Sequence, residues 1–125
     1  MTTDLKGRLA SMFAGLLAVL VFAAAPMVHA QEATSSQTAW RLLDYLSVDY
    51  AGAVKDGKVI SPSEYAEMNE FAGQVRDRIA GLPATKAQPD LLAKAESLQA
   101  TIAAKQEPAM VSAKAHARAN DLLAA

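Results

Sequence analysis

Apolar residues recur every three or four positions in four separate segments of the chain. This spacing places them along one face of an α-helix, and it predicts helices over about residues 39–54, 62–82, 89–105 and 108–122. The positions predicted to be buried are Ala39, Leu43, Leu46, Tyr50 and Ala53 in the first helix, Tyr65, Met68, Ala72, Val75, Ile79 and Leu82 in the second, Leu91, Ala95, Leu98 and Ile102 in the third, and Val111, Ala115, Ala119 and Leu122 in the fourth.

Turn and capping residues separate the predicted helices. Residues 61–64, Ser-Pro-Ser-Glu, combine an N-cap serine, a proline at the first helical position and a glutamate that can complete a capping box. Asp56 and Gly57 predict a turn after the first helix, because Asp bonds to nearby backbone groups and Gly accepts a positive φ. Residues 59–60 that follow are too few for more than a short extended segment.

The connections between the predicted helices are short, and two of them end in a proline. Pro89 and Pro108 each suit the first turn of a helix, so they mark where the third and fourth helices begin. Connections of roughly 5–10 residues favour antiparallel packing of consecutive helices. The sequence therefore predicts an all-α protein that folds as a four-helix up-down-up-down bundle.

The N-terminal residues have the pattern of a secretory signal peptide. Lys6 and Arg8 precede an apolar run over residues 9–25, and Pro26 ends that run. Residues 28–30, Val-His-Ala, place small side chains at the two positions that signal peptidase reads. An uncleaved membrane anchor is the alternative, because about 17 apolar residues are at the lower limit of a bilayer span. The proline and the small residues favour cleavage.

Cleavage after Ala30 divides the chain into three predicted parts. Residues 1–30 are the signal peptide, residues 31–37 are a flexible lead-in rich in Ser, Thr and Gln, and residues 38–125 are the helical bundle domain. Thr38 is the predicted N-cap of the first helix. Export from a bacterial-type cell predicts a periplasmic location.

The composition excludes several classes of protein. The 125 residues include no Cys and 2 His, with 12 basic residues (Lys and Arg) and 13 acidic residues (Asp and Glu). Without Cys the chain forms no disulfide, thiolate zinc site, c-type haem or cysteine nucleophile. The nearly balanced charge disfavours nonspecific binding to nucleic acid. No set of side chains supplies a nucleophile with its base, so we expect a protein that is not an enzyme.

Four neighbouring segments carry a resemblance to a known family. They are residues 40–50 (WRLLDYLSVDY), 51–54 (AGAV), 56–60 (DGKVI) and 64–71 (EYAEMNEF). Over about residues 40–75 the chain resembles the exported N-terminal region of bacterial high-affinity iron permeases, the oxidase-dependent iron transporter family. The resemblance implies a helical periplasmic region of the kind that precedes membrane helices with iron-binding Arg-Glu-x-x-Glu motifs.

The chain lacks the parts with which such permeases move iron. After residue 30 no apolar run is long enough for a bilayer span, and neither Cys-x-x-Cys-His nor Arg-Glu-x-x-Glu occurs. We therefore expect an accessory or binding module of iron uptake without transport activity of its own. It is either a truncated or split permease or a separately encoded domain. The last predicted helix reaches Ala125 with no Gly, Asn or Pro to end it, which favours truncation.

The resemblance also implies partners for the module. They are the membrane part of an iron permease or another periplasmic iron-uptake component, and we expect contact with the membrane only through the signal peptide or such a partner. The alternative function is that of a structural or oligomerisation domain that binds no ligand. Metal titration distinguishes the two hypotheses, because only a binding module should give heat with iron.

Five carboxylates are the candidate metal ligands: Asp44, Asp49, Glu64, Glu67 and Glu70. The three glutamates follow one another at three-residue spacing, which brings neighbouring Cβ atoms to about 5–6 Å on a helix. Carboxylates from two helices of a bundle can hold Fe²⁺ or Fe³⁺, and Asp49 with Glu67 is the pair to test first. The alternative is a solvated acidic face, in which Glu64 acts only as a helix cap.

The remaining polar and aromatic residues have simpler interpretations. His116 has basic neighbours and no carboxylate close in sequence, so we expect it to face solvent. Trp40, Tyr45 and Tyr50 have helical spacing, which is more typical of core residues than of a docking surface. Tyr45 lies off the apolar stripe and is the expected exception.

Overall fold

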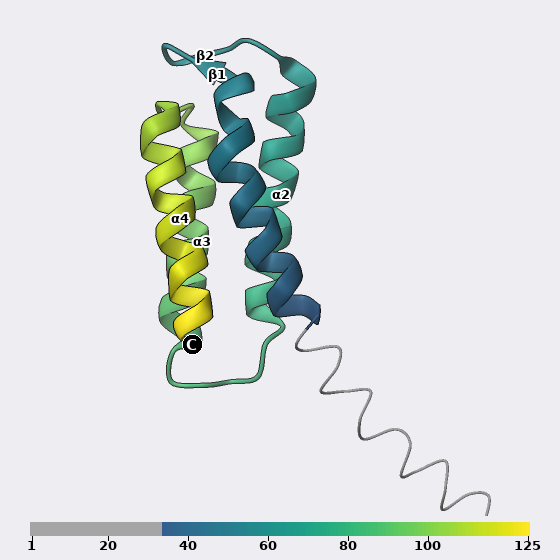
Figure 1. Cartoon of the computed structure of the whole chain (residues 1–125), viewed down its shortest axis with the longest axis vertical. Coiled ribbons are helices and arrows are strands. Elements are labelled where there is room, and N and C mark those ends of the chain that lie inside the picture. Colours follow the sequence, from purple (N-terminus) through teal and green to yellow (C-terminus); the bar gives the residue numbers. More distant parts are fainter. Residues whose placement is uncertain (1–33) are drawn as a thin grey trace, which may run out of the picture. The chain divides into compact units, whose positions relative to one another are not determined.

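The computed structural model describes residues 34–125, which form four helices and a short pair of strands (Figure 1). The first helix covers residues 34–49. It is followed by the 3-10 turn η1 (Tyr50–Gly52), the strands β1 (Val54–Lys55) and β2 (Lys58–Val59), and the helices α2 (Pro62–Ala80), α3 (Gln88–Ala103) and α4 (Pro108–Ala124). The predicted signal peptide, its cleavage site and the first residues of the predicted lead-in lie outside the described residues.

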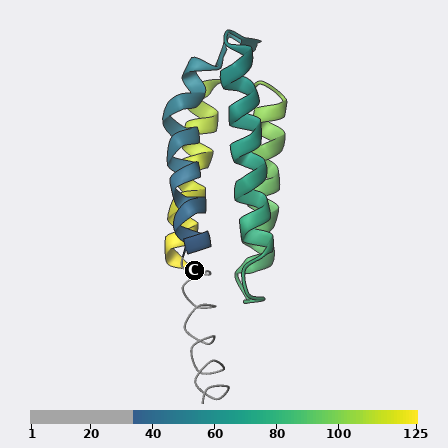
Figure 2. The same cartoon turned by 90° about the vertical axis from the view of Figure 1, so that its right-hand side faces the viewer.

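Consecutive helices run in opposite directions, which confirms the prediction of an all-α, four-helix up-down-up-down bundle (Figure 1). The first helix lies beside α2 and α4, and α3 lies diagonally across the bundle from it (Figure 2). We call the end that carries β1 and β2 the hairpin end. The opposite end, where the described chain begins and α4 ends, is the terminal end. Within the described residues, no helix has the length and apolar character needed to cross a membrane.

The first helix begins and ends earlier than the predicted range of residues 39–54. Thr38 lies inside it, and its Oγ1 donates a hydrogen bond to the Thr34 carbonyl oxygen at 2.8 Å instead of capping the helix. Residues 34–37, which the Ser/Thr/Gln composition assigned to the flexible lead-in, are therefore helical. None of residues 34–37 is buried; they extend the helix by one turn ahead of its buried face, which starts at Ala39, 1% exposed.

A tight hairpin connects the first helix to α2. Asp56 and Gly57 have φ angles of 51° and 72°, so both adopt the left-handed conformation of a type I′ turn, which confirms the predicted turn. The flanking residues form the antiparallel pair β1–β2, whereas the sequence predicted only an extended segment. Ala53 and Val54 are fully buried just before the turn, which anchors the hairpin to the core.

The start of α2 uses half of the predicted capping box. The Ser61 Oγ accepts a hydrogen bond from the Glu64 N–H at 3.4 Å, as expected for an N-cap serine. The reciprocal bond is replaced, because the Ser61 N–H donates to the Ala53 carbonyl oxygen at 3.4 Å. The carboxylate of Glu64 therefore lies over Gly52, where an added Cβ would be 3.6 Å from Oε2.

The predicted stripes of α2, α3 and α4 form the core. Their buried members are Met68, Ala72, Val75 and Ile79, then Leu91, Ala95, Leu98 and Ile102, then Val111, Ala115 and Ala119. The first helix adds Leu42, Leu43 and Leu46, and residues 34–125 form a compact unit with this core. Tyr50 is fully buried as predicted, but Trp40 and Tyr45 are 37% and 51% exposed. The core interpretation was therefore wrong for Trp40, and Tyr45 is the expected exception.

Two helix ends of the bundle are capped by residues that the sequence pattern did not single out. At the end of α3, Lys105 has a φ of 54°. Its N–H donates to the Ile102 carbonyl oxygen and the Gln106 N–H donates to the Thr101 carbonyl oxygen, and these two bonds form a Schellman motif. At the end of α2, the Gln88 Nε2 atom lies 2.8–3.2 Å from three carbonyl oxygens, those of Ile79, Ala80 and Leu82. Both caps satisfy carbonyl groups that a helix leaves without partners.

The core assignment is tested by a charge placed in the seam of α2. We expect Met68→Asp to lower the free energy of unfolding by about 3 kcal/mol or more, because it buries an unpaired carboxylate. Glu70→Ala serves as the control, since Glu70 is exposed and, among residues 34–125, its carboxylate accepts a hydrogen bond from the Gln74 side chain alone. Thermal melting of both variants checks this, and equal melting temperatures would contradict the assignment of the core.

The left-handed residue after α3 gives a second stability test. We expect Lys105→Gly to raise the free energy of unfolding by about 0.5–1 kcal/mol, because glycine adopts a positive φ without the steric cost that a Cβ imposes. Lys105→Ala keeps the Cβ and should leave stability unchanged. Denaturant unfolding of the two variants measures the difference, and a gain with alanine as large as with glycine would argue against backbone strain.

Candidate functional site

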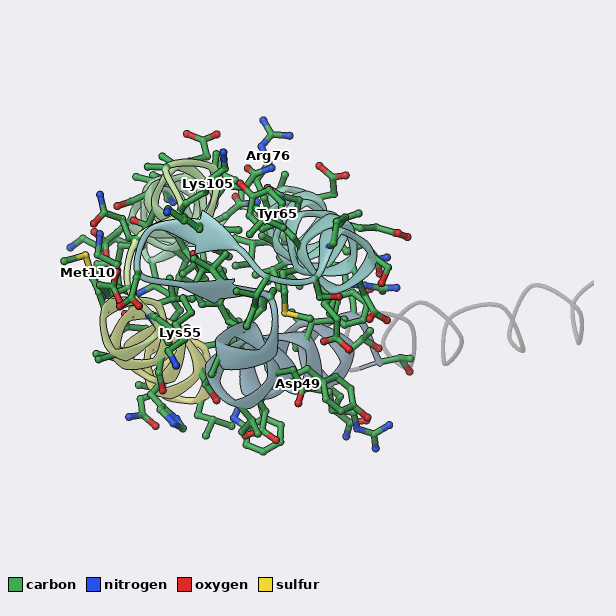
Figure 3. All side chains as sticks on the ribbon, turned by 90° about the horizontal axis from the view of Figure 1, so that it is seen from above. Asp49, Lys55, Tyr65, Arg76, Lys105 and Met110 are labelled. Carbon is green, nitrogen blue, oxygen red and sulfur yellow. The ribbon has the colours of Figure 1, made fainter. Side chains whose placement is uncertain are left out.

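All five predicted metal ligands lie in the half of the bundle near the hairpin end, and all five are exposed. Asp44 and Asp49 belong to the last part of the first helix. Glu64, Glu67 and Glu70 follow one another from the start of α2. Figure 3, which views the bundle from the hairpin end, shows Asp49 on the outside of the first helix.

An aromatic contact fixes how the first helix and α2 are aligned. The rings of Tyr45 and Phe71 lie with their centroids 6.2 Å apart at an interplanar angle of 35°. Asp49 follows Tyr45 by four residues, and Glu67 precedes Phe71 by four residues. Because the two helices are antiparallel, both carboxylates lie one turn from the ring contact toward the hairpin end. Asp49 and Glu67 therefore lie at the same level of the bundle, exposed on either side of the seam between the first helix and α2.

The other three candidates are not drawn into one cluster with this pair. Glu70 accepts a hydrogen bond from the Gln74 Nε2 at 3.2 Å, and the carboxylate of Glu64 lies over Gly52. The Asp44 backbone carbonyl oxygen accepts a hydrogen bond from the Ser47 hydroxyl at 2.7 Å, and this bond does not involve the Asp44 carboxylate. Within residues 34–125, no group of three or more His, Cys, Asp or Glu side chains is arranged to hold a metal ion.

Negative charge is concentrated in this half of the bundle. When each helix is divided at its middle, the hairpin half comprises residues 42–71 and 96–116. Its eight acidic residues are Asp44, Asp49, Asp56, Glu64, Glu67, Glu70, Glu96 and Glu107, and its four basic residues are Lys55, Lys58, Lys105 and Lys114. Among the described residues, none of the five candidate ligands forms an ion pair. Their charges are therefore uncompensated by close partners.

The ion pairs of the described residues lie mainly in the other half. Lys94 contacts Asp90 at 2.7 Å and Asp121 at 3.5 Å, and Arg118 lies 3.4 Å from Asp121. The hydrogen bond that the Lys94 ammonium donates to Asp90, and then the charge of Asp121, raise the pKa of Lys94. This network joins α3 to the end of α4.

Two tyrosines close the hairpin end from the inside. The Tyr50 hydroxyl donates to the Gln106 carbonyl oxygen at 2.7 Å. The Tyr65 hydroxyl donates to the carbonyl oxygens of Ile102 at 3.0 Å and Ala103 at 3.3 Å. Burial, and then the neighbouring Tyr65 and Glu107, raise the pKa of Tyr50 to about 12. The stripe spacing predicts Tyr50 as a core residue, but the partners of the two hydroxyls depend on a turn more than 35 residues away in sequence. His116 is exposed, as predicted.

Comparison with known proteins gives one match. A family model described as the iron permease-associated 4-helix bundle domain matches residues 26–125. No curated protein and no solved structure matches the chain. The family match confirms the resemblance seen around residues 40–75, and it extends over the Ala-rich second half of the chain. The match shows the bundle domain and no membrane permease part.

The raised pKa of Tyr50 predicts a loss of stability at high pH. Below pH 10 the hydroxyl is protonated in both states, but between about pH 10 and 12 it ionises only in the unfolded chain. The free energy of unfolding should therefore fall by up to about 2 kcal/mol as pH rises through this range. Tyr50→Phe should lose this dependence, at a cost of about 1 kcal/mol at neutral pH from the missing hydrogen bond.

Denaturant unfolding between pH 8 and pH 12 measures the effect, and Tyr45→Phe is the matched control because Tyr45 is exposed. Parallel stability curves for the wild type and Tyr50→Phe would show that another group causes the loss.

Proposed function

The chain belongs to the family of iron permease-associated 4-helix bundle domains, and we propose that it is a periplasmic accessory module of iron uptake with no catalytic or transport activity of its own. The signal-peptide pattern of residues 1–30 supports export to the periplasm. Its proposed partner is the membrane part of an iron permease or another periplasmic component of iron uptake.

The observation that carries the proposal is the uncompensated negative charge of the hairpin half. An acidic surface raises the local concentration of cations and speeds their encounter with the protein. Because the carboxylates are exposed and Asp49 and Glu67 lie at the same level beside one seam, a hard cation such as Fe²⁺ or Fe³⁺ can be bound by carboxylate oxygens. The other candidates, Asp44, Glu64 and Glu70, add to the field around this pair.

Such binding is weak and fast to reverse. Two carboxylates leave most positions around the cation to water, and exposed charges are screened by salt. A site with more ligands would bind iron more tightly and release it more slowly. Weak binding at an exposed surface suits a module that gathers iron and releases it to a partner.

Calorimetry and melting with iron test the role of the pair. We expect ferrous, ferric or manganous ions at low salt to give heat above dilution and to raise the melting temperature by several degrees at about ten times the dissociation constant. Asp49→Asn and Glu67→Gln should each abolish the rise. Both should also stabilise the metal-free protein slightly, because each removes a like charge from the seam.

The matched control is Glu96→Gln, which removes an exposed carboxylate on α3 together with its 3.4 Å ion pair to Arg76 and leaves the seam unchanged. It should retain the full metal-dependent rise. If no metal gives heat, or if the Asp49 and Glu67 variants respond like the wild type, the carboxylates do not bind iron. The domain would then act through structural or oligomeric contacts.

A further inference from the structure

The terminal end of the bundle exposes apolar side chains around a shallow groove. The groove has a volume of about 420 Å³ and is lined by Ser36, Gln37, Trp40, Arg41, Leu122 and Leu123. It lies between the first helix and α4, at the end where the described chain begins and α4 ends. Leu123 is 70% exposed and Trp40 is 37% exposed. A tryptophan beside leucines at the surface of a small domain suits the boundary between water and lipid.

The same end carries an excess of positive charge. The terminal half comprises residues 34–41, 72–95 and 117–125. Its six basic residues are Arg41, Arg76, Arg78, Lys86, Lys94 and Arg118, and its three acidic residues are Asp77, Asp90 and Asp121. Each of the three aspartates is paired with a basic residue. Arg41, Arg78 and Lys86 form no ion pair among residues 34–125, so their charges are available to a ligand.

We propose that the terminal end binds the surface of a bilayer that contains anionic lipid headgroups. Arg41 and Lys86 are exposed at this end and would contact lipid phosphates, while Trp40 and Leu123 would enter the region between headgroups and acyl chains. The acidic hairpin half is repelled by the same surface and faces away from it. This contact goes beyond the proposed function, since it uses different residues and does not require metal binding.

Charge complementarity favours a lipid surface as the partner of this groove over a second copy of the chain in a two-fold dimer. A two-fold dimer through this groove would bring two basic surfaces together, and like charges in contact oppose association. The near-neutral composition gives no sign of direct membrane contact, because the charges of the two halves nearly cancel. The positive surface arises only when the fold gathers Arg41, Arg78 and Lys86 in the terminal half of the bundle.

Vesicle binding by residues 31–125 tests the proposal without the apolar run of residues 9–25; the core and its compact unit lie within this fragment. The probes are vesicles of phosphatidylcholine, with and without phosphatidylglycerol, at low and high salt. We expect binding only to the anionic vesicles, and a steep loss of binding at high salt. Trp40 is the single tryptophan of the chain, so its fluorescence emission should shift to shorter wavelength on binding.

Substitutions distinguish this surface from the rest of the molecule. Trp40→Ser should weaken vesicle binding about tenfold. The pair Arg41→Gln and Lys86→Gln should weaken it about fivefold for each charge removed. Val48→Ser removes an exposed apolar residue of the same helix, and Lys55→Gln with Lys58→Gln removes two exposed charges at the hairpin end. These controls should bind as the wild type does, and circular dichroism verifies that every variant is folded.

Several results would overturn the proposal. They are no binding to anionic vesicles at low salt, binding without a shift in Trp40 emission, or equal losses in the control variants. Self-association that Trp40→Ser abolishes in the absence of lipid would instead identify a protein interface. Iron binding is measured separately and without vesicles, so failure of the membrane contact leaves the proposed iron role untouched, and the reverse also holds.

Discussion

The buried hydroxyl of Tyr50 is the constraint on which the closed bundle depends. A phenol with no exposed surface must find an acceptor inside the protein, and it finds the Gln106 carbonyl oxygen in the turn between α3 and α4. This bond joins the end of the first helix to a turn 56 residues away, and Tyr65 adds a second link from α2 to the end of α3. The two tyrosines therefore connect both halves of the chain at one end of the bundle.

This closure determines where the charged groups are placed. The tyrosines fill the interior of the hairpin end, so the carboxylates of the first helix and α2 stay at the surface, where ionisation costs little. Asp49 and Glu67 lie at the same level beside the seam between these two helices, and neither is buried. The acidic end therefore acts through its electrostatic field and through weak contacts, and the tyrosine hydrogen bonds beneath it join the segments that carry those charges.

Much of the fold follows from the sequence, but the contacts that close it do not. The stripes from Met68 to Ala119 predict the core because a helix repeats every 3.6 residues, and Ser61 predicts the start of α2 from local chemistry. Lys105 takes a conformation usually held by glycine, and Gln88 caps α2 from the following helix, so neither has a local signal. The pairing of Asp49 with Glu67 is predicted from carboxylates on two neighbouring helices, and the Tyr45–Phe71 contact then gives the alignment of those helices.

The opposite polarity of the two ends also results from topology. Acidic residues dominate residues 42–71 and basic residues dominate residues 72–95, and antiparallel packing places these blocks at opposite ends. A helix of 17 residues, such as α4, is about 25 Å long, whereas charges in 0.1 M salt are screened over about 10 Å. The two ends therefore act nearly independently on their surroundings. The proposed membrane contact can orient the domain without weakening the attraction of cations at the acidic end.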